Sequence, residues 1–479
     1  MTRRYFLLFI AGITIVRLIV ASLVPLAPDE AYYWLWSRHL RPGYYDDAPL
    51  IALWIKAGTG LIGQSPLGIR LLSPIGAAIG SLLLWRAGDD LFPGRNAGIV
   101  AAILLNATLM LNAGAIITTP DTPLLLFWTA TIAAVARWHA TGDDRWWIAA
   151  GIAEGLAFES KYTGVLLFPI VGLWLLMSPA GRAALRRPLP WIGLGFGLLL
   201  FAPVIFWNAG HGWVSFAKQG GRSAHLDLSD TLKHLAGLIG GQLGLATPIV
   251  AALMAAGVWR AIRDRSIANK LVWLSVVIPG AIFVEHTLSG AVQANWPSIL
   301  YPGAALAASG AASDMTRKWL PAAVTLGAVI TAIVYAQAIA APIPLPVRHD
   351  PTALELAGWP QFAAGVARFA QVRHSAFIAG TDYATVAELA YRRPKSIAVI
   401  GVGPRWRYFD LPSLAPNARQ SGLLVEPRYL KPQTDGRFHD ATLIGALDRR
   451  RDHKTIEVYD LYRVELGSAV PDAIVRDAR

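Results

Sequence analysis

The sequence predicts a polytopic α-helical membrane protein with about eleven spans and a small α/β domain at its C-terminal end. Hydrophobic residues make up 54% of the 479-residue chain and charged residues only 15%. A soluble domain carries about 25% charged residues. So much apolar surface exceeds what one water-soluble core buries, and it also excludes a disordered chain. A protein that crosses a bilayer many times accounts for this composition.

Apolar stretches of about 20 residues are long enough to cross a membrane, and the chain has about eleven stretches that approach this length. They lie at 5–26, 67–85, 97–113, 121–137, 146–160, 163–177, 190–207, 235–258, 271–284, 296–312 and 319–341. The first stretch follows Arg3 and Arg4 and has no small-residue cleavage site after it. We therefore expect a retained span rather than a removed signal peptide.

The distribution of Lys and Arg residues predicts the orientation of these spans. One set of connections holds fifteen of these residues and the other set holds seven, although the second set is longer in total. The positive-inside rule places the first set, and with it the N-terminus, in the cytoplasm. An odd number of spans then places the C-terminal segment outside. The basic residues behind the net charge of +12 are thus distributed as expected for a membrane protein, and no nucleic-acid partner is predicted.

Residues 342–479 differ in composition from residues 1–341, which form the predicted transmembrane domain. The C-terminal segment holds 19 of the 43 Lys and Arg residues and 15 of the 31 Asp and Glu residues. Strand-like and helix-like runs alternate in it, which predicts a small α/β domain on the extracytoplasmic face. These runs are 375–379, 383–391, 396–402 and 455–466, and the Pro-rich stretch 342–346 is the predicted linker.

The first outer loop, residues 27–66, carries two adjacent acids at the start of an aromatic-rich helical segment, Asp29 and Glu30. One interpretation is structural: Asp29 follows Pro28 as an N-cap, and both acids favour the positive end of the helix dipole. The other interpretation is chemical, because a carboxylate at the membrane surface can take a proton from an acceptor hydroxyl. The residues alone leave both interpretations open.

Two further acidic groups fall on the same predicted membrane face. Asp121 follows Thr118, Thr119 and Pro120 at the outer start of the fourth span, where a simple helix start is the alternative. The pair at 46–47 precedes Ala-Pro and, taken alone, reads as an acidic turn. The convergence of three acidic groups on one face favours a catalytic surface there.

Basic side chains on that face are candidates for binding a lipid-linked phosphate. Lys161 ends the fifth span, and Lys218 and Arg222 follow the seventh. Each could instead extend its apolar stem toward the membrane surface without a ligand. Inside the spans, a buried charge is costly unless it is paired. We therefore expect Glu154 to pair with one of the two arginines at positions 17 and 70.

The chain has no cysteine, which excludes disulfides, zinc-thiolate sites, iron–sulfur clusters and a cysteine nucleophile. His286, next to Glu285 in the last outer loop, is a candidate metal ligand, with an ordinary polar span end as the alternative. No cofactor is therefore assigned, and a divalent metal ion stays open.

Several motifs resemble one glycosyltransferase group. The runs DEAYYWLWS from Asp29 and GYYDDAPL from Gly43 resemble the first periplasmic loop of bacterial enzymes of the protein-O-mannosyltransferase-like superfamily, glycosyltransferase family 39. The nearest branch holds lipid A aminoarabinose transferases and lipopolysaccharide galacturonosyltransferases. The motifs at 119–121, 160–163 and 295–297 match in order. The resemblance covers most of residues 1–312.

The resemblance implies a GT-C fold and a position in the bacterial inner (plasma) membrane. It implies transfer of a hexosyl- or pentosyl-type sugar from a polyprenyl-phosphate donor to a lipid, glycan or protein acceptor on the periplasmic face. The implied catalytic residues are Asp29, with Glu30 beside it, and Asp121. An inverting displacement from a phosphate leaving group needs one base, and Asp29 is our choice. Asp121 would orient the acceptor, a basic side chain or a divalent ion.

The implied substrate-binding residues are Asp46, Asp47, Lys161, Tyr162, Lys218, Arg222 and Asn295. One position departs from the family pattern, because relatives usually place His or Lys where this chain has Asp47. Lys161, Lys218 or Arg222 would then supply the positive charge for the phosphate.

A polytopic transporter or a flippase for lipid-linked sugars is the alternative function. It predicts charges at the membrane midplane and two similar halves with broken helices. The sequence shows no internal repeat, and its acids gather at one face. A sizeable C-terminal segment outside the membrane also favours a transferase.

Overall fold

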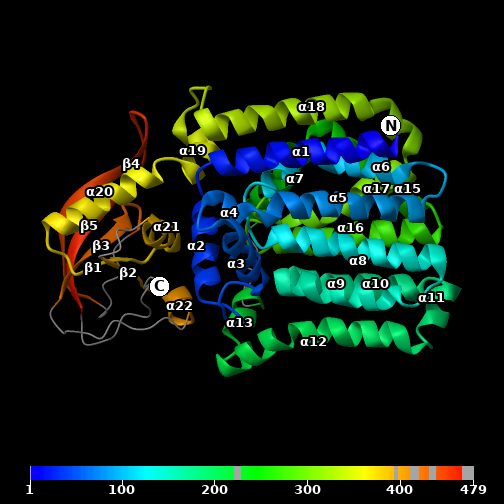
Figure 1. Cartoon of the computed structure of the whole chain (residues 1–479), viewed down its shortest axis with the longest axis horizontal. Helices are drawn as coiled ribbons and strands as arrows, with labels where there is room; N and C mark the ends of the chain where they lie inside the picture. The colour runs from blue at the N-terminus through cyan, green and yellow to red at the C-terminus, as the bar shows by residue number, and fades with distance from the viewer. Residues whose placement is uncertain (1, 221–227, 393–396, 410–419, 431–437, 467–479) are drawn as a thin grey trace. The chain divides into compact units, whose positions relative to one another are not determined.

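The structure is a computed structural model that describes residues 2–220, 228–392, 397–409, 420–430 and 438–466. The chain forms two compact units (Figure 1). The first, here called the helical unit, comprises the residues up to 22, 47–54 and 70–335; the second, the mixed unit, comprises 23–46, 55–69 and the residues from 336 onward. Segments of the first outer loop therefore belong to the same unit as the C-terminal sheet.

Helices account for almost all of the helical unit. They are α1 (Arg3–Leu23), α5 (Leu72–Leu91), α6 (Ala97–Asn106), α7 (Leu109–Gly114), α8 (Asp121–Thr141), α9 (Trp146–Ser160), α10 (Leu167–Leu176), α11 (Pro179–Ala184), α12 (Pro188–Gly210), α13 (Val214–Gly220), α14 (Leu228–Ala246), α15 (Pro248–Arg263), α16 (Ile267–His286), α17 (Leu300–Gly310) and α18 (Ser313–Ala340), whose last turn belongs to the mixed unit. Short 3₁₀ turns, Tyr162–Leu166 and Trp296–Ile299, precede α10 and α17.

Each of the predicted apolar stretches coincides with a helix or with two consecutive helices. Among the described residues, five helices are long and apolar enough to cross a membrane by themselves, or six if one bent pair counts as a span. The chain is therefore a multi-pass membrane protein, whereas the number of eleven spans stays a prediction.

The stretch 235–258 departs from the straight span that its hydropathy suggests. It forms α14 and α15, which are bent by 108° relative to one another. Thr247 lies between them with φ +69°, and Pro248 follows it. Proline disfavours helical backbone in the residue before it and has no N–H to continue the hydrogen-bond ladder. The helix therefore breaks at this position.

Four helices of this unit, α5, α8, α9 and α12, follow one another as neighbours (Figure 1). α9 and α12 approach so closely that a Cβ on Gly151 would overlap the backbone of Gly193. Small residues allow such close approach between helices in lipid, where packing replaces the hydrophobic driving force. Large aromatic side chains, including Trp128 and Trp174, are fully buried in the core of the unit.

The mixed unit contains a five-stranded sheet with strand order β2-β1-β3-β5-β4. β1 runs parallel to β2 and β3, whereas β5 runs antiparallel to β3 and β4. Its elements are α2 (Pro28–Arg38), α3 (Leu50–Ile62, from residue 55), α4 (Pro66–Arg70, to residue 69), α19 (Pro351–Leu356), α20 (Trp359–Val372), β1 (Phe377–Gly380), α21 (Tyr383–Arg392), β2 (Ala398–Gly401), α22 (Pro404–Arg407), β3 (Ser421–Pro427), β4 (Phe438–Arg451) and β5 (Lys454–Leu466). The predicted small α/β domain is thus confirmed.

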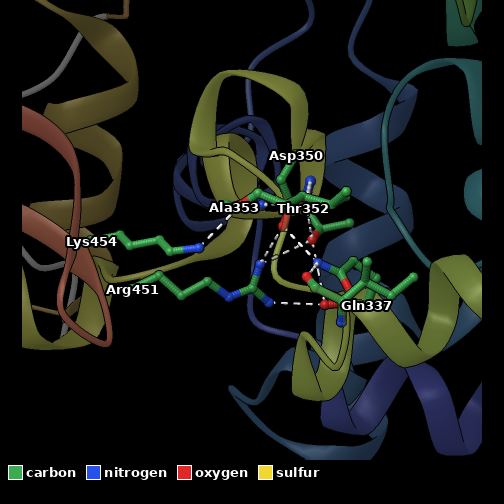
Figure 2. A network of polar contacts seen from close by, with 8 residues as sticks. Gln337, Asp350, Thr352, Ala353, Arg451 and Lys454 are labelled. Carbon is green, nitrogen blue, oxygen red and sulfur yellow. Dashed lines mark hydrogen bonds and ion pairs between the residues drawn. The ribbon is translucent and has the colours of Figure 1, made fainter.

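Side chains of the sheet, together with residues that flank the Pro-rich stretch 342–346 in the sequence, hold this stretch in place (Figure 2). Arg451, at the β4–β5 turn, donates to Asp350 Oδ2 at 3.1 Å and to the backbone oxygen of Gln337, in the last turn of α18, at 2.9 Å. Gln337 donates in turn to Asp350 Oδ2 at 2.8 Å, and Lys454 Nζ donates to a backbone oxygen of the stretch at 3.3 Å. The stretch is therefore a bound connection rather than a free hinge.

Candidate functional site

Asp121, Lys161 and Asn295 meet in the helical unit. Lys161 Nζ lies 2.8 Å from Asp121 Oδ1 and 3.0 Å from Oδ2, and Asn295 Nδ2 donates to Oδ2 at 2.7 Å. The side chains of Lys161 and Asp121 are only 13% and 10% exposed. Lys161 also lies over the ring of Trp296, 5.3 Å from its centroid. Segments that are distant in the sequence therefore contribute to one buried ion pair.

The role of Asp121 at the start of α8 is not that of an ordinary helix cap. The N-cap position is occupied by Pro120, which provides no capping side chain. The carboxylate of Asp121 instead binds side chains of two other segments, Lys161 and Asn295. Asp121 thus lies in the first turn of α8, as the helix-start interpretation expects, and its carboxylate also binds two distant side chains. Its catalytic role stays a prediction.

Asp47 lies within electrostatic range of the same ion pair. Its Oδ1 accepts hydrogen bonds from the backbone N–H of Ala48 at 3.0 Å and of Tyr162 at 3.3 Å. Burial raises the pKa of Asp47 to about 7; the charge of Lys161 opposes this shift and that of Asp121 adds to it. The departure at Asp47 from the pattern of the resembling enzymes thus places a second carboxyl group, rather than a cation, in electrostatic range of Asp121 and Lys161.

The raised pKa of Asp47 makes the stability of the protein depend on pH. Between its ordinary value of 3.8 and about 7, the folded state keeps a proton that the unfolded state has released, so stability falls as the pH rises. Asp47→Asn removes this proton and keeps an acceptor for Ala48 and Tyr162. We expect the variant to match the wild type only at about pH 4, where the unfolded state also keeps most of its proton, and to unfold roughly 3 to 6 °C higher at about pH 8. Thermal unfolding in detergent at both pH values measures this; an equal difference at the two values would contradict it.

The other predicted acids of the first outer loop lie in the mixed unit. The half-buried Asp29 accepts a hydrogen bond through Oδ1 from the hydroxyl of Tyr383 at 2.8 Å. Asp46 binds the hydroxyl of Tyr32 through Oδ2 at 2.6 Å and Arg405 Nε through Oδ1 at 3.1 Å. Tyr383 and Arg405 were not predicted. No local sequence signal points to them, because Tyr383 lies 354 positions after Asp29.

The start of α2 corrects the structural interpretation of Asp29 and Glu30. The N-cap is Ala27, not Asp29, and the fully buried Glu30 accepts a hydrogen bond from the backbone N–H of Ala27 at 3.0 Å. A glutamate in the third helical position is the acid that can reach back in this way. Glu30 therefore takes the capping contact, and the catalytic role suggested for it stays a prediction.

The remaining candidates are not gathered at these contacts. Lys218 is half-buried in α13, and Arg222 lies outside the described residues. Glu285 is exposed, and the ring of His286 packs against Trp296 with centroids 5.5 Å apart. Throughout the described ranges, no three His, Cys, Asp or Glu side chains form a group that could hold a metal ion.

The expected pairing of Glu154 with Arg17 is wrong. Arg17 on α1 is buried and donates to the side-chain oxygens of Asn106 at 2.9 Å and Asn112 at 2.8 Å. Arg70 donates to the backbone oxygen of Ala21. Neutral oxygens thus bind two nitrogens of the buried guanidinium of Arg17, Nε and Nη2, without the cost of burying a second charge.

These features define a class: a multi-pass α-helical membrane protein with a small C-terminal sheet and with carboxylates on its outer-loop segments and helix starts. Comparisons with known proteins agree. The family described as dolichyl-phosphate-mannose-protein mannosyltransferase matches residues 46–207. The lipid A galacturonosyltransferase RgtD of Rhizobium johnstonii is 29% identical over 308 residues, which span 63% of this chain and 64% of that relative.

A solved structure matches nearly the whole chain. The crystal structure of ArnT from Cupriavidus metallidurans in the apo state has a TM-score of 0.64 at 15% identity and covers 96% of this chain and 97% of its own. ArnT bound to undecaprenyl phosphate gives the same TM-score and identity, with coverages of 98% and 99%. The fold is therefore of the GT-C type seen in ArnT, and the resemblance to GT-C glycosyltransferases is confirmed.

Proposed function

We propose that the chain is a membrane glycosyltransferase that moves a sugar from a polyprenyl-phosphate donor to a lipid, glycan or protein acceptor. The observation that carries the proposal is the assembly of Asp121, Lys161 and Asn295, with Asp47 in electrostatic range, on a GT-C fold. The relatives support the substrate classes. One carries the name lipid A galacturonosyltransferase, and the neighbouring ArnT structure holds undecaprenyl phosphate.

The chemistry of such a transfer suits these side chains. The prenyl tail stays in the lipid while the sugar phosphate lies at the membrane surface. The acceptor hydroxyl gives its proton to Asp29 and forms the new bond to the anomeric carbon, whose bond to the phosphate oxygen breaks with inversion. Lys161 stabilises the charge that develops on the leaving phosphate. Asp121 holds Lys161 and Asn295 in place for this contact.

The periplasmic face of a bacterial inner membrane is the proposed location of the reaction, with the N-terminus in the cytoplasm. Residues 27–46 of the first outer loop and the C-terminal sheet belong to one compact unit, in which α2 packs against α21. Two segments in direct contact must lie on the same side of the membrane. An odd number of spans and the positive-inside distribution of Lys and Arg both support this arrangement.

The test of the proposed function is mass spectrometry of envelope glycolipids and glycoproteins from a deletion strain. We expect one sugar mass to disappear and to return with the wild-type gene. A second assay uses the purified protein in vesicles, with polyprenyl-linked sugar and acceptor both added to one side. Transfer there excludes a flippase, which would move the donor without forming the product. An unchanged set of sugars in the deletion strain would contradict the proposal.

A further inference from the structure

The first outer loop is packed against side chains of the C-terminal sheet domain within the mixed unit. Tyr44 in the loop contacts Phe409, with ring centroids 5.8 Å apart, and Tyr45 stacks on Tyr408 at 5.5 Å. α2 also packs against α21. The conformation of the loop is therefore set by residues that lie more than 350 positions away in the sequence.

Two side chains of the C-terminal domain bind the two loop acids directly. The Tyr383 hydroxyl donates to Asp29 Oδ1 at 2.8 Å, and Arg405 Nε lies 3.1 Å from Asp46 Oδ1. Arg405 also lies over the ring of Tyr383, 3.8 Å from its centroid. The hydroxyl of Tyr32 binds the second oxygen of Asp46 at 2.6 Å. One continuous network therefore joins the side chains of Asp29, Asp46, Tyr32, Tyr383 and Arg405.

Among the described residues of this unit, the groups that interact with the charge of Asp29 include Tyr383 on α21, Glu355 on α19 and Tyr32 on its own helix. Burial raises the pKa of both tyrosines, so they keep their protons and act as donors. Burial, followed by the charge of Asp29, also raises the pKa of Glu355. Arg405 faces both tyrosines from α22 and supplies the positive charge of the network.

We propose that Tyr383 and Arg405 are positioning residues for sugar transfer: Tyr383 orients Asp29 and stabilises its charged form, and Arg405 fixes Tyr383 and Asp46. The inference rests on the proposed function, with Asp29 as base. A carboxylate that loses a donated hydrogen bond holds its proton to a higher pH. A base that is turned away from its substrate by about 1 Å can lose about a hundredfold in rate. The C-terminal domain thus completes the chemistry of the first outer loop.

The test compares Tyr383→Phe and Arg405→Gln with the wild type in membranes of the deletion strain. Sugar addition to the endogenous acceptor is measured by mass spectrometry at about pH 6 and about pH 8. We expect Tyr383→Phe to lower the rate about ten- to a hundredfold, with a larger loss at the lower pH. The phenylalanine keeps the ring beneath Arg405, so the variant should lose only the hydrogen bond to Asp29 and stay folded at the assay temperature. Glu355 is a second carboxyl group near Asp29. If the pH dependence of the loss is the same in a Glu355→Gln background, the titrating group is Asp29.

Matched controls come from the same domain. Tyr429 is 70% exposed, and Arg428 pairs with Asp460 at the surface, so Tyr429→Phe and Arg428→Gln should retain wild-type transfer. If the wild type adds no sugar, the proposed function fails. If Tyr383→Phe transfers sugar as fast as an active wild type at both pH values, the positioning role is wrong and the proposed function stands. A loss in Tyr383→Phe that is equal at both pH values, or that follows its unfolding, also overturns the positioning role.

Discussion

Asp29→Asn is expected to lower the rate of sugar transfer by about 10² to 10⁴-fold, because an amide cannot accept the proton of the acceptor hydroxyl. The asparagine oxygen can still accept the hydrogen bond from Tyr383. The variant should therefore stay folded in the membrane with nearly unchanged thermal unfolding. The measurement is the return of the missing sugar mass when the variant gene is placed in the deletion strain.

The matched control for Asp29→Asn is the same substitution at Asp452. That residue is exposed at the β4–β5 turn with φ +52°, a conformation that asparagine tolerates. Asp452→Asn should restore the sugar fully. Full restoration by Asp29→Asn would show that Asp29 is not the base and would leave Asp47, whose pKa burial raises to about 7, as the carboxyl group to test next.

The helices could be predicted from the sequence because the length and periodicity of an apolar stretch depend only on consecutive residues. Each apolar stretch became a helix or a helix pair. The break at Thr247 was missed, although Pro248 marks it, because hydropathy averages over the stretch and carries no backbone angle. In the C-terminal domain the runs around β1, α21, β2 and β5 were predicted, whereas β3, β4 and α20 were not.

The candidate site was only partly predictable, for a different reason. Individual acids could be found because Asp29, Asp46, Asp47 and Asp121 stand at loop and helix-start positions on one predicted face. Their partners could not be found, because a contact such as that of Tyr383 with Asp29 depends on how distant segments fold together.

The same limit explains the error at Arg17. The sequence suggested a carboxylate partner because opposite charges attract in lipid. Two amide oxygens, those of Asn106 and Asn112, are the partners instead. Asparagine carries no charge signal along a sequence, so a buried cation can be satisfied by residues that charge patterning does not mark.

Lys161→Met is expected to damage both stability and donor use. Because Asp121 is only 10% exposed, loss of its cation leaves a buried carboxylate whose remaining partner among the described residues is Asn295. We expect this loss to cost about 3 kcal/mol. The double variant Lys161→Met with Asp121→Asn removes both charges and should regain most of this stability. Thermal unfolding of both single variants and the double variant gives the coupling energy.

The control is the surface ion pair of Lys233 and Asp230, whose side chains are 73% and 57% exposed. The same substitutions in this pair should change the unfolding temperature little.

Donor use separates a binding role for Lys161 from a purely structural one. An ammonium group has three donors, and two contacts go to the oxygens of Asp121, which leaves a donor for a phosphate oxygen. The double variant should therefore unfold near the wild-type temperature and still transfer sugar at least about tenfold more slowly, with weaker inhibition by added undecaprenyl phosphate. Full recovery of transfer in the folded double variant would contradict phosphate binding by Lys161. In that case the ion pair with Asp121 would serve only to hold the helical unit together.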